Sequence, residues 1–252
     1  MLKYPLSTLL YIAKINIKDT IKDALKLHNN IDVSLTVIVK DKDGKMIKQH
    51  KQHSHSFVMN FLALISNALM NPYNSYSNLY YYIATNGGWY SDAGSDTTFG
   101  QFLNMLDGAN DSTYGIVVGT GTATPTPNDY ALRNQIQNGT GTGQLVYSAH
   151  TVNPPPASSY INNSSQPSTG VLNVSGNTTS IQISRQFSNQ SGASITASEV
   201  GIIVETDSYA VVSGSAYYTP TFVLIVHDLL SSPITIPNNA VLTIVYTISI
   251  ST

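Results

Sequence analysis

Short apolar segments separated by turn-forming residues run from Tyr114 to the end of the chain, and this pattern most constrains the fold. Gly, Pro, Asn and Ser stand between the segments. Many short strands with such turns are typical of antiparallel sandwiches and jelly rolls. We therefore predict a mainly β protein with an antiparallel β-sandwich or jelly-roll-like domain over 114–252. Its strands are predicted at 114–119, 143–152, 180–189, 194–206, 221–230 and 240–250, with shorter ones at 170–174 and 233–236.

A small α+β region is predicted before the sandwich, over residues 1–72. The stretch INIKDTIKDALKLH (15–28) places apolar residues on one helical face and lysines on another, which indicates an amphipathic helix. Asp43-Gly44 predicts the turn of a hairpin. The apolar stretch at 56–70 predicts a buried helix that ends before Pro72. The Tyr-, Asn- and Gly-rich residues 73–113 are predicted to connect the two regions or to form an interface.

Charge is scarce and unevenly placed. Only 10% of residues are charged, and the formal net charge is −2. Residues 1–55 carry ten Lys and five Asp, which sum to +5, and the rest carries two Arg and nine acids, which sum to −7. The basic segment would suit nucleic acid, a membrane or an acidic partner, or it is a solvated helix and hairpin. The neutral remainder suits a chain that packs against copies of itself, because burying charge is costly.

The sequence contains no residue that forms disulfides and no clear export signal. The chain has no cysteine, which excludes disulfides and thiolate metal sites. The apolar stretch PLSTLLYIA (5–13) is short and lacks a clean small-residue cleavage site. No run reaches the length of a transmembrane helix. We expect a protein made in the cytoplasm without Sec processing and without a transmembrane span.

Three histidines, His50, His53 and His55, lie within six positions of one another. In an extended strand His53 and His55 point to one face and His50 to the other. Two histidines on one face can begin a zinc site, but the remaining ligands would have to come from elsewhere. We expect a strand that leads into the following helix, with no metal bound.

Two loops resemble ligand-binding motifs only in part. DKDGK (41–45) opens like a calcium loop, but its glycine comes too early and no glutamate follows at the twelfth position. GTGTATPTPNDYAL (119–132) lacks both the GxGxxG register and the lysine of a phosphate loop. We predict a hairpin turn and a rigid loop, in which Asn128 or Asp129 caps a short helical turn.

Candidate catalytic groups are few. Glu199 and Glu205 are the only glutamates, and six residues of one strand place them about 20 Å apart, too far for a glycosidase pair. His227 and Asp228 are strand neighbours and are expected to point to opposite faces. No GxSxG nucleophile elbow is present. We expect no enzymatic activity and no cofactor.

Two sets of residues are candidate contact or modification sites. Aromatic residues gathered in loops mark an interface or a glycan contact, or else they fill the gap between layers. Asn-x-Ser/Thr sequons mark candidate N-glycosylation sites, although several arise by chance in this composition. The aromatic candidates are Tyr80, Tyr81, Tyr82, Trp89 and Tyr90, and the sequons begin at Asn110, Asn138, Asn162, Asn163, Asn173, Asn177 and Asn189.

Two blocks of the chain carry a resemblance. HSHSFVMNFLALI resembles a motif near the start of structural proteins of phages and archaeal viruses, where such a helix follows a charged hairpin. The block from GIVVGTG through ISRQFSNQSGASITASEVGIIV to LIVHDLLSSPITIPNNAVLTIVYTI resembles a β-domain of tail-associated and other virion proteins. The blocks cover roughly residues 30–70 and 114–252. The family usually has Arg-Asp where this chain has His227-Asp228, and it offers no catalytic residues to carry over.

The resemblance implies a virion structural protein, that is, a tail, fibre, spike or capsid-layer component. Its expected partners are copies of itself and other virion proteins, and its basic N-terminal segment would face nucleic acid or an acidic partner. The composition suits a virus of a hot-environment archaeon. A carbohydrate- or host-surface-binding adhesin and a subunit of an extracellular filament remain as alternatives.

Overall fold

The computed structural model describes residues 31–54, 56–70, 81–91, 105, 108–153, 173–212 and 215–251. The amphipathic helix predicted over 15–28 lies outside these residues, as does much of the connecting region predicted over 73–113.

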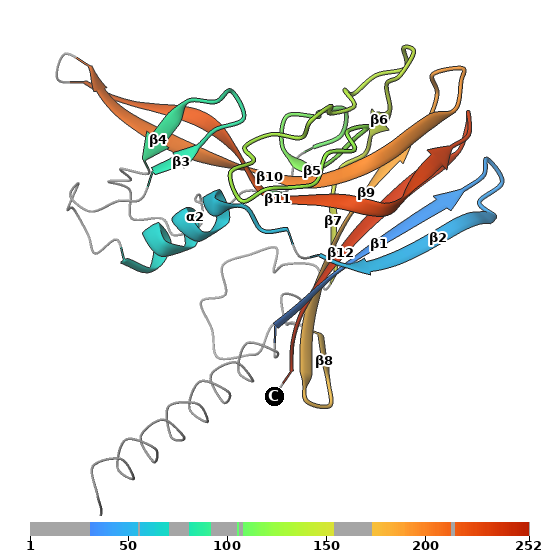
Figure 1. Ribbon diagram of the computed structural model, residues 1–252, viewed down its shortest axis with the longest axis horizontal. Coiled ribbons are helices and arrows are strands. Elements are labelled where there is room, and N and C mark those ends of the chain that lie inside the picture. The colour runs from blue at the N-terminus through green and yellow to red at the C-terminus, as the bar shows by residue number, and fades with distance from the viewer. Residues whose placement is uncertain are drawn as a thin grey trace, which may run out of the picture.

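The larger sheet, here called sheet A, has seven antiparallel strands (Figure 1). Its order is β2–β1–β12–β9–β6, and β7 and β8 also pair with β9. Residues on β9 and β12 alternate between buried and partly exposed, as expected for strands that cover a core with one face only. The strands are β1 (Ile31–Lys40), β2 (Met46–His53), β6 (Val146–Tyr147), β7 (Thr151–Asn153), β8 (Asn173–Ser175), β9 (Thr178–Ser188) and β12 (Val241–Ser251).

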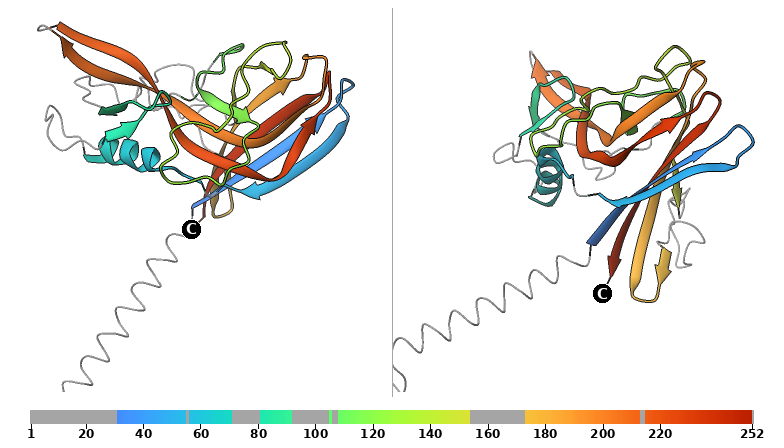
Figure 2. Two further views of the ribbon diagram at one scale, coloured as in Figure 1. Left: turned by 45° about the horizontal axis from the view of Figure 1, so that its top comes forward. Right: turned by 45° about the vertical axis from the view of Figure 1, so that its right-hand side comes forward.

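Sheet B packs against sheet A and completes the sandwich (Figures 1 and 2). Its order is β11–β10–β5, again antiparallel, with β5 (Gly115–Gly119), β10 (Ile195–Val212) and β11 (Ser215–Ile236). The buried side chains of both sheets form one apolar cluster. The predicted mainly β, antiparallel sandwich is therefore confirmed. Strands β10 and β11 run further than the sequence predicts and form a long hairpin that projects beyond the sandwich (Figure 1).

One helix and a two-stranded sheet lie beside the long hairpin. Helix α2 (Met59–Met70) confirms the helix predicted over 56–70, and β3 (Tyr81–Ile83) pairs with β4 (Trp89–Ser91). Asn60 joins these elements to sheet B: its amide nitrogen donates to the carbonyls of Ile83 and Leu224, and its amide oxygen accepts from the Ile83 N–H. No helix among the described residues is both long and apolar enough to cross a bilayer.

The hairpin β1–β2 is part of the sandwich rather than of a separate N-terminal region. Strand β1 pairs with β12 over its whole length, from Ile31 opposite Ile250 to Lys40 opposite Val241. Val33, Leu35, Val37 and Val39 point into the core. The sequence pattern predicts the hairpin itself, but the local pattern does not show that its partner lies two hundred residues away.

A single buried arginine fastens the irregular segments to sheet A. Arg185 on β9 is 1% exposed and lies over the Tyr147 ring, with its guanidinium carbon 4.7 Å from the ring centroid. Its five N–H groups are all used, because a guanidinium offers five donors in a fixed fork. They donate to the carbonyl oxygens of Gly108, Asp111, Tyr114, Ile116 and Ser148 at 2.6–3.1 Å.

Replacement of Arg185 by lysine is expected to lower the free energy of unfolding by about 2–4 kcal/mol, because an ammonium has only three donors and cannot reach five carbonyls at once. Urea unfolding followed by circular dichroism measures the change. The matched control is Gln186→Lys, on the exposed side of the same strand, which is expected to change stability by less than about 0.5 kcal/mol. Equal effects of the two substitutions would contradict this role.

Candidate functional site

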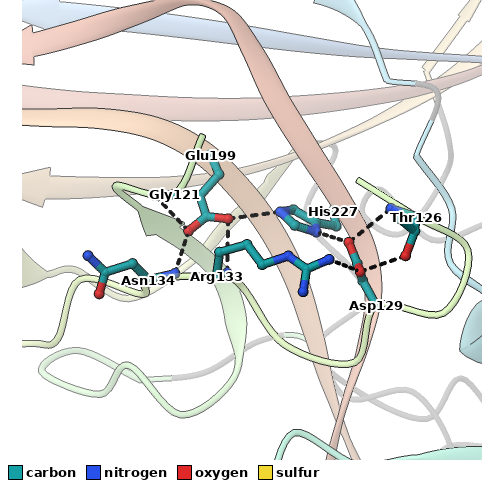
Figure 3. Close-up of polar contacts among 7 residues, drawn as sticks. All are labelled: Gly121, Thr126, Asp129, Arg133, Asn134, Glu199 and His227. Carbon is teal, nitrogen blue, oxygen red and sulfur yellow. Dashed lines mark hydrogen bonds and ion pairs between the residues drawn. The ribbon is translucent and has the colours of Figure 1, made fainter. Parts of the chain in front are cut away.

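The most unusual chemistry of the described residues is a histidine held between two carboxylates inside the protein (Figure 3). The Nδ1 atom of His227 lies 2.7 Å from Oδ2 of Asp129, and its Nε2 atom lies 2.8 Å from Oε2 of Glu199. The side chains of His227 and Glu199 are 0% exposed and that of Asp129 is 3% exposed. Arg133 adds a second cation, with Nη2 2.6 Å from Oδ1 of Asp129. We call these four residues the ion cluster.

Sheet B positions two members of the ion cluster and one loop positions the other two. Glu199 lies on β10 and His227 on the neighbouring β11, where it stands directly opposite Gly201. A side chain at Gly201 would clash with Leu132, so the glycine lets the loop approach the sheet. Asp129 and Arg133 belong to this loop, which runs from β5 back across sheet B.

His227 carries a positive charge in this arrangement. Each ring nitrogen faces a carboxylate oxygen, and an ionised carboxylate can only accept a hydrogen bond. Both ring nitrogens therefore carry protons and donate. Two cations, His227 and Arg133, then balance the two anions, Asp129 and Glu199, so the ion cluster is neutral as a whole. A balanced, hydrogen-bonded set is the form in which charge is tolerated in a protein interior.

The pKa values of the three buried groups shift in the directions that this charge state requires. Burial alone would lower the pKa of His227, but hydrogen bonds and charges from Glu199 and Asp129 raise it above the ordinary 6.5. Burial alone would raise the pKa of Glu199, but the hydrogen bonds that it accepts bring it below 4.5. The pKa of Asp129 likewise falls below 3.8, because hydrogen bonds from Thr126 and His227 outweigh burial.

Glu199 also holds the loop through its backbone. Its two carboxylate oxygens accept N–H groups from Gly121, Arg133 and Asn134 at 2.8–3.1 Å, in addition to the bond from His227. A β-carbon at Gly121 would clash with this carboxylate, as would one at Gly119. The alternating glycines of GTGT are therefore explained by close approach of the backbone to Glu199, and no phosphate is needed to explain them.

Asp129 holds the other side of the same loop. Its carboxylate accepts the backbone N–H and the hydroxyl of Thr126, at 3.0 and 2.8 Å. The predicted role of Asn128 or Asp129 as the cap of a short helical turn is wrong: Asp129 accepts from Thr126, three residues earlier, and residues 126–134 form no helical turn. The loop is therefore held to sheet B at two points: Asp129 bonds His227, and the N–H groups of Gly121, Arg133 and Asn134 bond Glu199.

This arrangement leaves the cluster little capacity for catalysis. A general base needs a free ring nitrogen, and both nitrogens of His227 are occupied by carboxylates. A metal ligand needs the same lone pair. Among the described residues no group of three or more His, Cys, Asp or Glu side chains is arranged to hold a metal ion. The groups that look most reactive in the sequence therefore act to hold the fold.

Asp228 points to the opposite face of β11 from His227, as predicted for strand neighbours. One of its carboxylate oxygens, Oδ2, accepts hydrogen bonds from the hydroxyls of Ser54 and Tyr246 at 2.7 and 2.9 Å. Burial raises the pKa of Tyr246 well above 10, and the neighbouring carboxylate raises it further. The two neighbours thus act on opposite faces of β11. His227 holds the loop, and Asp228 holds the chain before α2 and strand β12.

Sequence reasoning missed the ion cluster because it considered its members separately. Glu199 was considered only with Glu205, and His227 only with Asp228. A usable signal was present, since Glu199 and His227 both interrupt apolar strand segments, SEVGIIV and VLIVHDLL. An ionisable residue within a buried strand requires a partner, and the short list of remaining acids includes Asp129.

The histidine run lies along the seam between the two sheets. The Nε2 atom of His50 is 3.1 Å from Oε1 of Gln52 and 2.9 Å from the hydroxyl of Ser231 at the edge of sheet B. His53 turns the other way and pairs with Asp32 at 2.9 Å. His55 lies outside the described residues. The predicted strand that leads into a helix is confirmed.

The predicted surface sites are only partly described. Strands β3 and β4 contain Tyr81, Tyr82, Trp89 and Tyr90, and they place Tyr82 opposite Tyr90 in the pairing register. Tyr80 lies outside the described residues. This pairing gathers four of the five aromatic candidates into one hairpin, and the glycan or interface role predicted for them stays a prediction.

Among the sequons, Asn189 requires a correction. Its side chain is 0% exposed, and its amide nitrogen donates to the carbonyls of Ala193 and Ile236, so the folded protein has no room for a glycan there. Asn110 and Asn177 are exposed, and Asn138 is half-buried and hydrogen-bonded to Asn110 and Tyr147. Asn173 lies on β8, and Asn162 and Asn163 lie outside the described residues.

Comparison with known proteins gives no relative: no family model matches the chain, and neither a curated protein nor a solved structure is detectably similar to it.

Replacement of Glu199 by glutamine is expected to lower the free energy of unfolding by about 3–5 kcal/mol, because it leaves a buried cation without its anion. The matched control is Glu205→Gln, the other glutamate of the same strand, which is partly exposed. It is expected to cost less than about 1 kcal/mol. Chemical denaturation of both variants measures the difference, and similar costs would show that the ion cluster does not hold the fold.

The stability of the protein is expected to depend on pH in both directions. The contribution of His227, whose pKa is raised, is complete below its unfolded value of 6.5 and is lost as the pH rises through the folded pKa. The contributions of Glu199 and Asp129, whose pKa values are lowered, are complete above 4.5 and are lost as the pH falls through their folded values.

Unfolding free energy measured across the pH range should therefore have its plateau between 4.5 and 6.5. In His227→Gln the decline on the alkaline side should disappear, since the substituted side chain does not titrate. An unchanged alkaline decline in this variant would assign the pH dependence to other groups.

Proposed function

We propose that the chain is a non-enzymatic structural component of a virus particle, such as a tail, fibre, spike or capsid-layer protein, that assembles with copies of itself. The resemblance of its sequence blocks to virion proteins suggests the particle. The uncharged central part of the outer face of sheet A, on β9 and β12, is the observation that supports self-assembly. The ion cluster supports a structural role, because it uses the most reactive groups to hold a loop in place.

The outer face of sheet A is formed at its centre by alternate residues of β9 and β12. These residues point away from the core and are at least partly exposed. Ten carry a hydroxyl or an amide, two are valines, and none is charged. In register they are Val241 with Ser188, Thr243 with Gln186, Val245 with Ser184, Thr247 with Gln182, Ser249 with Ser180, and Ser251 with Thr178.

Such a face is suited to burial against another subunit. Removing a charge from water is expensive unless it is paired, whereas hydroxyls and amides find partners on any surface that offers donors and acceptors. A sheet face whose central strands carry no charge therefore has a small desolvation penalty when another subunit covers it. Stable interfaces bury roughly 800 Å² on each partner, which a face two strands wide begins to supply.

The assembly proposal predicts that a charge at the centre of this face prevents association. Thr243→Lys places an ammonium beside Gln186 and should shift purified protein from assemblies to monomers in sedimentation velocity and negative-stain electron microscopy. The matched control, Thr196→Lys, adds the same charge at an exposed position of β10 in sheet B and should leave assembly unchanged. Assembly by both variants would reject this face as the interface.

Immunogold electron microscopy of the native source tests the virion assignment separately. Antibody against the sandwich should label particles, and the labelled position distinguishes shell, tail and tip. Label on cell envelopes or filaments, with none on particles, would reject the virion and support the extracellular filament.

A carbohydrate-binding adhesin is the second candidate, and the β3–β4 hairpin is the observation that favours it. The pairing of Tyr82 with Tyr90 places aromatic residues on adjacent strands. Aromatic rings supply the apolar, amphipathic contacts that sugars use. Binding to a glycan array that is lost in Trp89→Ala but retained in Thr243→Lys would separate attachment from assembly.

A further inference from the structure

The β1–β2 hairpin, with the turn that joins its strands, carries every lysine of the described residues. Lys40, Lys42, Lys45, Lys48 and Lys51 are the described lysines, and all five are exposed. Against them the hairpin from 40 to 51 has only Asp41 and Asp43, so its net charge is +3. The hairpin tip, which we define as residues 40–47, projects at the right-hand end of the sandwich in Figure 1.

Two large apolar side chains stand among the lysines of the hairpin tip. Met46 is 51% exposed and Ile47 is 50% exposed. The pairing register shifts here, with Val39 opposite Lys48 and Lys40 opposite Met46, so that Ile47 is an extra, bulged residue. Bulges re-aim a side chain and recur next to functional sites. Ile47 is therefore the extra residue of the bulge, without a pairing partner on β1, and its side chain faces solvent.

The turn at the hairpin tip is held by its own hydrogen bonds. The carboxylate of Asp41 accepts the backbone N–H groups of Asp43 and Lys45 at 3.0 and 2.9 Å, and Gly44 adopts a positive φ of 79°. The carboxylate of Asp41 is thus already engaged by hydrogen bonds within the turn. Lys42 pairs with Asp43, but both side chains are more than 70% exposed, where such a pair is weak.

We propose that the hairpin tip is a membrane-contact site that binds the surface of a bilayer rich in anionic phospholipid. Lys40, Lys42 and Lys45 would lie at the level of the phosphate and carboxylate headgroups, and Met46 and Ile47 would enter the acyl boundary. Lysine side chains suit this position because their stems tolerate apolar surroundings while the ammonium stays in the polar layer. This site goes beyond self-assembly and is independent of the interface on sheet A.

The combination of charge and aliphatic side chains favours lipid over nucleic acid. Single-stranded nucleic acid is bound by basic grooves with aromatic side chains on which bases stack, and the hairpin tip has no aromatic residue. Duplex binding needs phosphate contacts alone, and exposed Met46 and Ile47 add nothing to these. An anionic membrane uses both features, because basic residues attract the surface and apolar residues anchor in it.

Vesicle co-sedimentation of the full-length chain tests the proposal. Binding is expected to phosphatidylcholine vesicles that contain about 30% phosphatidylserine, to be weaker on pure phosphatidylcholine, and to fall as salt is raised to about 0.5 M. Lys45→Glu should lower the partition coefficient at least about fivefold and Ile47→Asn about tenfold. Both positions are exposed, so neither substitution disturbs the core.

Matched controls make the same substitutions elsewhere. Lys51→Glu lies on β2, about 20 Å from Lys45 in the turn before it, and Leu62→Asn lies on α2, where the side chain is 66% exposed. Both should bind vesicles like the unaltered protein. Losses equal to those of Lys45→Glu and Ile47→Asn would reject the hairpin tip as the contact site.

Depth of insertion supplies a second readout. Because the chain has no cysteine, Ile47→Cys and Lys51→Cys each create a single thiol for an environment-sensitive fluorophore. The emission from position 47 should shift to the blue on anionic vesicles, and that from position 51 should not. A different outcome would identify a nucleic-acid contact: neither emission shifts on vesicles, and oligonucleotides bind the unaltered protein and Ile47→Asn equally well. The lipid proposal would then be wrong. Failure here leaves the sheet A interface untouched, because Thr243→Lys is measured without lipid.

Discussion

The hydrogen bonds from His227 to Asp129 and Glu199 hold together parts of the chain that no regular pairing connects. The loop after β5 contributes no named strand, so it lacks the ladder of bonds that fixes sheets A and B. Its attachment depends on a charged imidazole that is completely enclosed. Burying ions costs free energy, and here three buried ions and the half-exposed Arg133 balance in charge, with nearly every hydrogen-bonding position filled. The arrangement gives the loop one position rather than many.

Buried ionisable side chains also hold irregular backbone elsewhere in the sandwich. Arg185 binds five carbonyls, one on β5 and four on irregular segments, and Asp228 accepts hydrogen bonds from two hydroxyls, those of Ser54 before α2 and Tyr246 on β12. Each of these groups is buried and ionisable, and each interrupts an apolar strand. In a chain with so few charges, the buried ones act as fasteners for irregular backbone. Among the described residues, every lysine is exposed and lies between positions 40 and 51.

The sequence was sufficient for the strands and insufficient for the contacts between them. Alternation along AVLTIVYTISI and the Asp43-Gly44 turn depends on neighbouring residues, so the strands and the hairpin follow from local physics. The extra length of β10 and β11, the pairing of β1 with β12, and the meeting of Asp129 with His227 depend on residues about a hundred or more positions apart or on tertiary packing. Arg185 and Phe187 are successive inward residues of β9, and Asn189, also buried, directly follows that strand.

The pairing of β1 with β12 has a consequence for biosynthesis. Sheet A cannot close until residues near Ile250 have left the ribosome, roughly 200 residues after Ile31. At about 5–20 residues per second, the β1–β2 hairpin waits for some 10–40 seconds with one edge unpaired. An open edge of this kind recruits other nascent chains, and β1, whose edge waits, carries only one lysine, Lys40, to oppose that recruitment. The lysines of β2 lie instead along the edge that stays unpaired in sheet A, where they oppose edge-to-edge association of the finished protein.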